Sequence, residues 1–166
     1  MTAQVWIAIL VGLAATIDDL KRRHISNWIC AAALAGGIGW QIGQNGFWPG
    51  ALYALAGAAA GFAVFLIFYL LGGMGGGDVK LMAGFGALLG TGRLLEAALW
   101  TAGIGGIMAV TILGWKALRR HIGTWVGAPL ETASKTLSAE EREREASIPY
   151  APAIALGVWI SLVPKG

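Results

Sequence analysis

Acidic side chains are scarce in this chain, and four of them lie in or beside its apolar segments. The 166 residues include nine acidic ones, and five of these fall between residues 131 and 145. Asp18 and Asp19 end one apolar segment. Asp78 begins another and directly follows a run with five glycines in six positions, residues 72–77. The fourth is Glu96, which lies three residues after Arg93, a spacing that permits an ion pair on one helix face. Carboxyl groups are common general acids and bases, so Asp18, Asp19 and Asp78 are the first candidates for chemistry.

A pair of carboxylates, one from each of these two places, could do two kinds of chemistry. In surroundings of low polarity both cannot easily be charged, so one proton tends to be shared between them. The ionised member can then take a proton from a trapped water, while the protonated member hydrogen-bonds the carbonyl of a peptide bond under attack. The same pair could instead bind a cation or relay protons in a transporter. The residue types alone leave both alternatives open.

The glycine run does not fit a phosphate-binding loop. Such a loop needs Lys and then Ser or Thr after its last glycine, whereas this run ends in Asp78, which would repel phosphate. What remains is a loop with free backbone rotation and room for close backbone approach.

The composition of the chain predicts that these acids are held by membrane helices. Apolar residues make up 57% of the chain and charged residues 13%, against about 25% charged in soluble domains. Several apolar segments reach the roughly 20 residues that carry a helix across a bilayer. The sequence therefore predicts an all-α membrane protein, a polytopic bundle of six transmembrane helices in one domain, residues 1–166. The six segments are 2–17, 28–43, 47–71, 79–92, 94–115 and 148–163.

The basic residues predict the orientation of this bundle. With the amino terminus outside, ten of the twelve Lys and Arg residues face the cytoplasm, in accord with the positive-inside rule. Six of these ten lie in the stretch 116–147, which is expected to be a cytoplasmic loop between helices five and six. The basic residues form no continuous patch, so a nucleic-acid partner is not expected. Both candidate sites for chemistry would lie at the cytoplasmic side.

The segment 79–92 is short for a membrane span. Its 14 residues make a helix of about 21 Å, against a hydrocarbon thickness of roughly 30 Å. A re-entrant hairpin is the alternative, but it would place the six basic residues of 116–147 outside, so we reject it. A short helix anchored at the outer face begins below the cytoplasmic surface, which puts Asp78 at membrane depth.

Small residues at helical spacing predict close packing between the helices. Three GxxxG pairs allow helix backbones to approach within the lipid. They indicate a compact bundle and leave a homo-oligomer open. The pairs are Gly39 with Gly43, Gly57 with Gly61, and Gly86 with Gly90.

The residues around the acids resemble the motifs of the prepilin peptidase family, membrane aspartic peptidases of the GxGD type that remove the leader from type IV prepilins and pseudopilins. Residues 75–81, Gly-Gly-Gly-Asp-Val-Lys-Leu, resemble the second aspartate motif, GxGDxKL. Residues 19–27 resemble the first, in which Asp-Leu is followed by four mostly basic or polar residues and then Ile-Pro-Asn, with Ser26 in place of the proline. This alignment selects the second of the two adjacent acids. Residues 149–157 are similar to the entrance of the family's last helix.

The resemblance implies that Asp19 and Asp78 are the catalytic pair, working without a metal ion or a cofactor. It implies site-shaping or substrate-binding roles for five further residues of the motifs. These are Gly75, Gly76, Gly77, Lys80 and Asn27. The chain has one cysteine and no cytoplasmic insert with a cysteine tetrad, so it is similar to the short, peptidase-only form found with Flp or tight-adherence pili.

The implied partner is a prepilin or pseudopilin with a short basic leader, a glycine before the cut and a hydrophobic helix behind it, embedded in the lipid bilayer. Cleavage is expected at the cytoplasmic face of the bacterial inner membrane. Lys80 either interacts with Asp78 or extends its ammonium group to the membrane surface, and Asn27 is expected to cap the helix that follows it. The alternatives from other classes are a small ion- or proton-coupled transporter and a non-enzymatic pilus assembly subunit.

Overall fold

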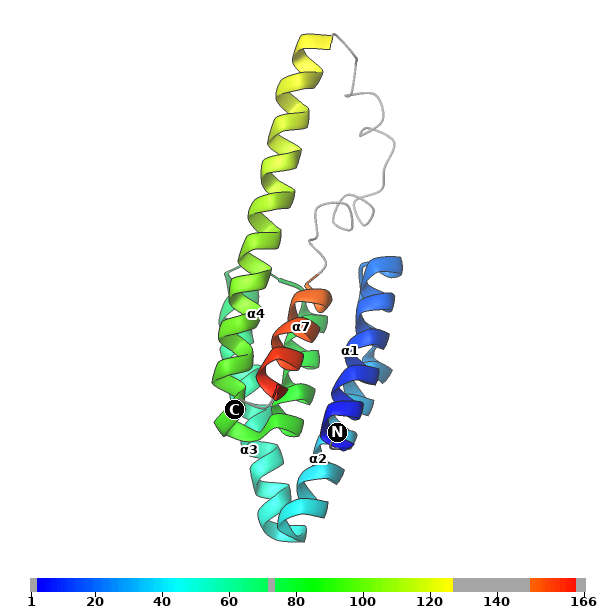
Figure 1. Ribbon diagram of the computed structural model, residues 1–166, viewed down its shortest axis with the longest axis vertical. Coiled ribbons are helices and arrows are strands. Elements are labelled where there is room, and N and C mark those ends of the chain that lie inside the picture. Colours follow the sequence, from blue (N-terminus) through cyan, green and yellow to red (C-terminus); the bar gives the residue numbers. More distant parts are fainter. Residues whose placement is uncertain (1–2, 72–73, 127–149, 164–166) are drawn as a thin grey trace.

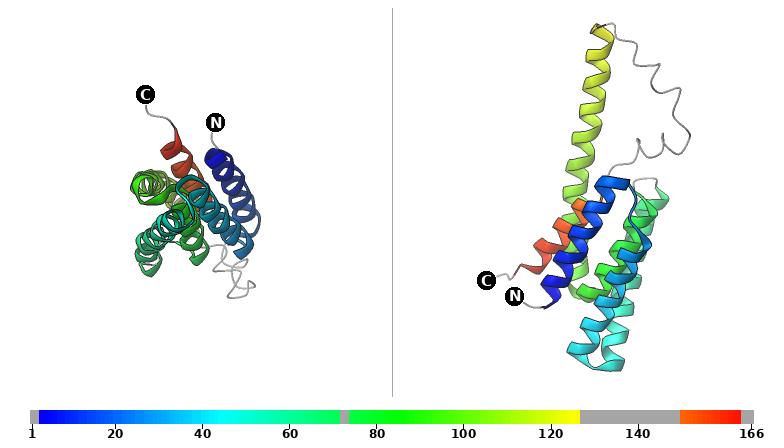
Figure 2. Two further views of the ribbon diagram at one scale, coloured as in Figure 1. Left: turned by 90° about the horizontal axis from the view of Figure 1, so that it is seen from below. Right: turned by 90° about the vertical axis from the view of Figure 1, so that its right-hand side faces the viewer.

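The computed structural model describes residues 3–71, 74–126 and 150–163, and within these ranges the chain is helical and contains no strand (Figure 1). The helices pack side by side as a bundle, as the two further views show (Figure 2). An all-helical bundle is therefore confirmed. The elements in chain order are α1 (Ala3–Arg22), α2 (Asn27–Asn45), α3 (Phe47–Leu70), α4 (Gly76–Val126) and α7 (Ala151–Leu162).

The element α4 is two helices joined by a reversal at Gly90. This residue has φ 67° and ψ 176°, a conformation that is essentially restricted to glycine. Gly61 of α3 lies beside both Met82 and Leu94, which stand on either side of the break. In one continuous helix those two residues would be about 18 Å apart along the axis. The first arm of α4 (residues 76–89) and the second arm (residues 91–126) therefore form a hairpin, as the separate apolar segments predict.

Two glutamine side chains donate hydrogen bonds to a backbone carbonyl that the reversal leaves without a helical partner. A helix end has backbone carbonyls without helical partners, and the break creates such an end inside the bundle. The carbonyl oxygen of Leu88 accepts hydrogen bonds from the side-chain amides of Gln4, at 2.9 Å, and Gln41, at 3.3 Å. These bonds tie α1 and α2 to the end of the first arm, at the opposite end of the bundle from Asp78.

Three helical stretches of the described chain are long and apolar enough to cross a membrane: Ala3–Arg22, Phe47–Leu70 and Gly76–Ile112. The third includes the reversal and parts of both arms. α7 is apolar but has only 12 residues. The membrane character of the bundle agrees with the composition, and the number of six spans stays a prediction.

The second arm extends further than its apolar segment. The expected helix ends near residue 115, but the observed one continues to Val126, so the expected loop 116–147 begins inside a helix. The remainder of that stretch, residues 127–149, lies outside the described part of the chain. Hydropathy marks where a helix leaves lipid rather than where it ends, so a helix can continue into the polar stretch, and the cytoplasmic placement of residues 116–147 stays a prediction. The second arm projects well beyond the other helices (Figures 1 and 2).

The first arm of α4 is the most buried part of the bundle. Its residues Leu81, Met82, Phe85 and Leu88 are almost fully inaccessible to solvent. It packs directly against α2 and α3. α4 as a whole also packs against α7, whereas α1 packs mainly against α7 and α2 and makes little contact with α4. The indole N–H of Trp159 in α7 donates to the carbonyl oxygen of Ala8 in α1.

Glycines allow α3 and the first arm to touch backbone to backbone. A methyl group built on Gly57 would overlap the carbonyl oxygen of Gly86, and one built on Gly86 would overlap that of Gly57. The close approach predicted for these glycines is confirmed. Gly39 and Gly43 are different, because they lie on an exposed face of α2 with no atom within 4 Å of a built methyl group.

Gly57→Ala should lower the free energy of unfolding by about 1–3 kcal/mol, the usual cost of overpacking, because the new methyl group collides with rigid backbone. Thermal unfolding of the purified protein in detergent, followed by tryptophan fluorescence, measures this loss. Gly43→Ala is the matched control and should leave stability unchanged or slightly higher, because its methyl group enters open space and alanine favours helix. Equal losses in the two variants would contradict the packing argument.

Candidate active site

Asp78 is held by the turn that begins α4. It lies in the first turn of this helix, and its Oδ2 accepts a hydrogen bond from the backbone N–H of Gly75 at 3.1 Å. The N–H of Asp78 in turn donates to the carbonyl oxygen of Gly75. This reciprocal pattern resembles half of a capping box, in which an acidic side chain reaches back to the amide before the helix. The other oxygen, Oδ1, is buried and has no hydrogen-bond partner among the described residues.

Asp19 is held by a helix from the far end of the chain. It stands near the carboxyl end of α1, and its Oδ2 accepts a hydrogen bond from the backbone N–H of Ala151, the first residue of α7, at 3.0 Å. The first amides of any helix lack helical partners, and a carboxylate there is favourably placed. Sequence analysis missed this donor. Pro152 was the available signal, since proline favours the first turn of a helix and so marks where free amides begin.

The two carboxylates line the same pocket. Asp19 and Asp78 are each only 6% exposed, and both contribute to a cavity of about 90 Å³. They are close enough for an electrostatic interaction between them. A water molecule needs a cavity of roughly 10–15 Å³, so the pocket has room for several. The remaining lining residues are Arg23, His24, Ile25, Gly75, Gly76 and Gly77.

Asp18 points away from this pocket and fastens the turn after α1. Adjacent residues on a helix project about 100° apart, so only one of the two acids can face the interior. Asp18 Oδ2 accepts the N–H of Ser26 at 2.8 Å, and its Oδ1 forms an ion pair with the Nε of Arg22 at 3.3 Å. The placement of Asp19 rather than Asp18 toward the interior agrees with the alignment of the motif.

Ser26, which stands where the family motif has proline, helps to hold the turn after α1. A proline at position 26 would have no N–H to give to Asp18. Ser26 has φ −62°, which is the value that proline would impose. The turn therefore keeps a proline-like conformation, and a hydrogen bond takes the place of the ring as its constraint.

Arg23 ends α1 in a conformation unusual for a residue with a side chain. Its φ is 50°, in the left-handed region, and its N–H donates to the carbonyl oxygen of Asp19 at 2.7 Å. This is the pattern of a helix cap that glycine usually supplies, and for other residues it costs roughly 1–2 kcal/mol. The reversal carries Arg23 and His24 to the rim of the pocket. Sequence analysis did not assign either residue to the site.

Lys80 and Asn27 lie outside the pocket and contact each other. The Nζ of Lys80 donates to the Oδ1 of Asn27 at 3.0 Å in an exposed position that links α4 to α2. Residues two apart on a helix do not face each other, so Lys80 points away from Asp78. The expectation that Asn27 caps α2 is wrong: Ser26 occupies the cap position, and Asn27 is the first helical residue. The two acids and the three glycines of the loop thus line one pocket, whereas Lys80 and Asn27 lie outside it.

The comparison with known families supplies an identity for the segment that carries both acids. The chain matches the type IV leader peptidase family over residues 6–110, more than half of its length. The chain belongs to that family. No curated protein and no solved structure gives a significant match. The matched segment includes Asp19 and Asp78, whereas α7, whose amide binds Asp19, lies beyond it.

The bond between Asp18 and Ser26 predicts a coupling that two substitutions can measure. Asp18→Ala should lower the free energy of unfolding more in the wild-type chain than in a Ser26→Pro background, because the proline has already removed the donor. Unfolding curves of the four proteins in a denaturant titration give the difference. A cost for Asp18→Ala that is the same in both backgrounds would show that the bond contributes nothing.

Proposed function

We propose that this peptidase is of the aspartic type and cleaves the leader of a prepilin or pseudopilin, using a water molecule activated between Asp19 and Asp78. The observation that carries the proposal is that two buried carboxylates from distant parts of the chain line one pocket large enough for water. Each carboxylate has one oxygen fixed by a backbone amide. Such fixing orients the remaining oxygens, which is the geometry that acid and base catalysis requires.

The two carboxylates divide the chemistry of hydrolysis between them. The ionised aspartate removes a proton from the water as its oxygen attacks the carbonyl carbon of the peptide bond. The protonated aspartate hydrogen-bonds the carbonyl oxygen, and the roles reverse when the leaving amine takes up a proton. The Oδ1 of Asp78, which has no hydrogen-bond partner within the described part of the chain, is the buried acceptor that a water molecule would satisfy.

The glycine loop forms a wall of the pocket that a peptide backbone can approach. Gly75, Gly76 and Gly77 line it without presenting side chains. A methyl group on Gly77 would stand 3.1 Å from the Cβ of Ile25, so there is little room for a larger residue at this position. An extended substrate would lie along this wall with its carbonyl toward the acids.

The depth of the site suits a substrate held in the bilayer. The first arm of α4 has about 14 residues and a length of about 21 Å, less than the roughly 30 Å of hydrocarbon. With the amino terminus outside, the pocket lies just below the cytoplasmic surface of the bacterial inner membrane. A prepilin whose hydrophobic helix spans the bilayer presents its leader junction at this level.

Removing either catalytic acid should abolish cleavage. Asp19→Asn and Asp78→Asn should each lower kcat by at least about 100-fold, because a positioned acid or base contributes 10²–10⁴-fold. Purified protein and a prepilin-like reporter with a basic leader and one hydrophobic helix provide the assay. Asp18→Asn is the matched control and should retain most activity, since its amide oxygen can still accept the N–H of Ser26.

Normal cleavage by either single variant would contradict the aspartic mechanism. A transporter or a non-enzymatic assembly subunit predicts something different, namely that the wild-type protein does not cleave the reporter at all.

The orientation can be tested with single cysteines in a Cys30→Ser background, Cys30 being buried. A cysteine at Gly92 should react with a membrane-impermeant maleimide in intact cells, because the glycine is exposed next to the outer reversal of α4. A cysteine at Arg120, near the end of the second arm, should react only after the inner membrane is made permeable. The reverse pattern of labelling would overturn the proposed topology.

A further inference from the structure

The two helices that carry the aspartates make little contact with each other. Asp19 lies near the end of α1 and Asp78 at the start of α4, and α1 packs mainly against α7 and α2. The amides of Ala151 and Gly75 each hold one of the two carboxylates. These bonds orient the carboxylates singly and do not join α1 to α4. The distance between the acids therefore depends on other contacts.

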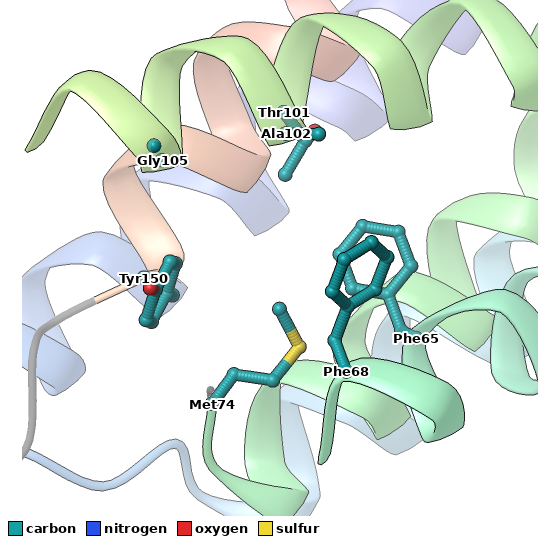
Figure 3. Close-up of a pocket in the computed structure, with 8 residues that line it drawn as sticks. Phe65, Phe68, Met74, Thr101, Ala102, Gly105 and Tyr150 are labelled. Atoms are coloured by element: carbon teal, nitrogen blue, oxygen red, sulfur yellow. The ribbon is translucent and has the colours of Figure 1, made fainter. Parts of the chain in front are cut away.

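On the side of α7, the glycine loop before Asp78 borders an open space. An apolar cavity of about 160 Å³ lies between Met74, which precedes the loop, and Tyr150, which precedes α7. Figure 3 shows these two side chains on different sides of the cavity, with two phenylalanine rings of α3 along another wall. Tyr150 instead contacts the second arm of α4, since a methyl group on Gly105 would stand 3.1 Å from its ring. On this side the loop therefore borders a cavity rather than a packed helix.

On the side of α2, the same loop is in direct contact with the turn after α1 and with the first turn of α2. The side chain of Ile25 is buried, and its Cβ would stand 3.1 Å from a methyl group on Gly77. The thiol of Cys30 donates a weak hydrogen bond to the carbonyl oxygen of Gly77, with 3.7 Å between sulfur and oxygen. Both contacts are made with the residue directly before Asp78.

The hydrogen bond between Lys80 and Asn27 adds a contact on the other side of Asp78. The Nζ of Lys80 lies 3.0 Å from the Oδ1 of Asn27. Asn27 and Cys30 are three residues apart on α2 and lie on one face of that helix. Gly77 and Lys80 are likewise three residues apart at the start of α4. The start of α2 therefore meets the first turn of α4 at two points, one before Asp78 and one after it.

The start of α2 is in turn joined to the end of α1. The N–H of Ser26, directly before Asn27, donates to Asp18, the neighbour of Asp19. A connection between the two aspartates thus runs from α1 through this turn to Asn27, and from there across to Lys80. Neither Asn27 nor Lys80 lines the aspartate pocket, and both line a separate groove of about 270 Å³ between α2, α3 and the first arm of α4. They can therefore act on the reaction through the position of the aspartates.

We propose that Lys80 and Asn27 are positioning residues, whose hydrogen bond sets the distance between the two aspartates by joining the start of α2 to the first turn of α4. This inference rests on the proposed function and deepens it. An exposed hydrogen bond contributes modestly to stability, whereas a displacement of about 1 Å at a reacting group can lower a rate by about 100-fold. Loss of this bond should therefore change catalysis far more than stability.

The test measures kcat and KM of the full chain in lipid nanodiscs with the prepilin-like reporter. Lys80→Met and Asn27→Ala should each lower kcat by about tenfold and change KM by less than about twofold, because the acids are displaced and the substrate contacts are not. The double variant should be no slower than either single variant, because the same bond is lost in all three. Lys80→Arg and Asn27→Asp, which keep a donor and an acceptor, should retain most of the activity.

The matched control is Lys21→Met, which removes an exposed lysine of α1 that lies outside the aspartate pocket. It should keep the wild-type kcat, which separates loss of the hydrogen bond from loss of a positive charge. An unchanged kcat in Asn27→Ala overturns the inference and leaves the proposed function standing. A rise in KM alone does the same, because it indicates contact with the substrate, and so do losses that add up in the double variant.

Thermal unfolding of each variant shows whether it is folded. If Lys80→Met is not, the kcat of Asn27→Ala decides the question. No cleavage of the reporter by the wild-type protein contradicts the proposed function, and the inference falls with it.

Discussion

A carboxylate withdrawn from water must be given hydrogen-bond donors, and the arrangement of this bundle around its acids follows from that requirement. Burying an ionisable group without partners is costly. The chain meets the need with amides at the beginning of two helices, which have no helical acceptors of their own. Gly75 supplies one donor to Asp78 within its own turn, and Ala151 supplies one to Asp19 across the fold. The starts of α4 and α7 are therefore brought to the carboxyl end of α1.

Glycine decides how these helix starts reach their positions. The reversal at Gly90 doubles α4 back on itself, so that the arm carrying Asp78 is enclosed by its neighbours. The contact between Gly57 and Gly86 then sets this arm directly against the backbone of α3. No side chain lies between the two at this point, which leaves little freedom for them to slide. The arm that carries Asp78 is thus held by close steric contact with α3 as well as by polar contacts.

The sequence predicted those parts of this arrangement that depend on residue type and on the lengths and spacing of apolar segments. Hydropathy separated the two arms of α4, and the motifs identified Asp19, Asp78 and the glycine loop as a group that the fold does bring together. What could not be predicted depends on direction in space. Lys80 lies two residues after Asp78 on α4 and therefore points in another direction, toward Asn27. The donor for Asp19 comes from a residue 132 positions away in the chain. The apolar cavity is likewise shared among three elements, none of which reveals it alone.

The way α1 is attached has a mechanical consequence. Near its amino end α1 is tied to the first arm through Gln4 and Leu88, while most of its contacts with other helices are with α7 and α2. Gln4 and Asp19 are separated by about 22 Å of helix, so a rigid tilt of about 5° around the glutamine would displace the carboxylate by about 2 Å. Membrane helices change tilt to match the thickness of the surrounding lipid. A change in membrane thickness that tilted α1 in this way would change the spacing of the two acids.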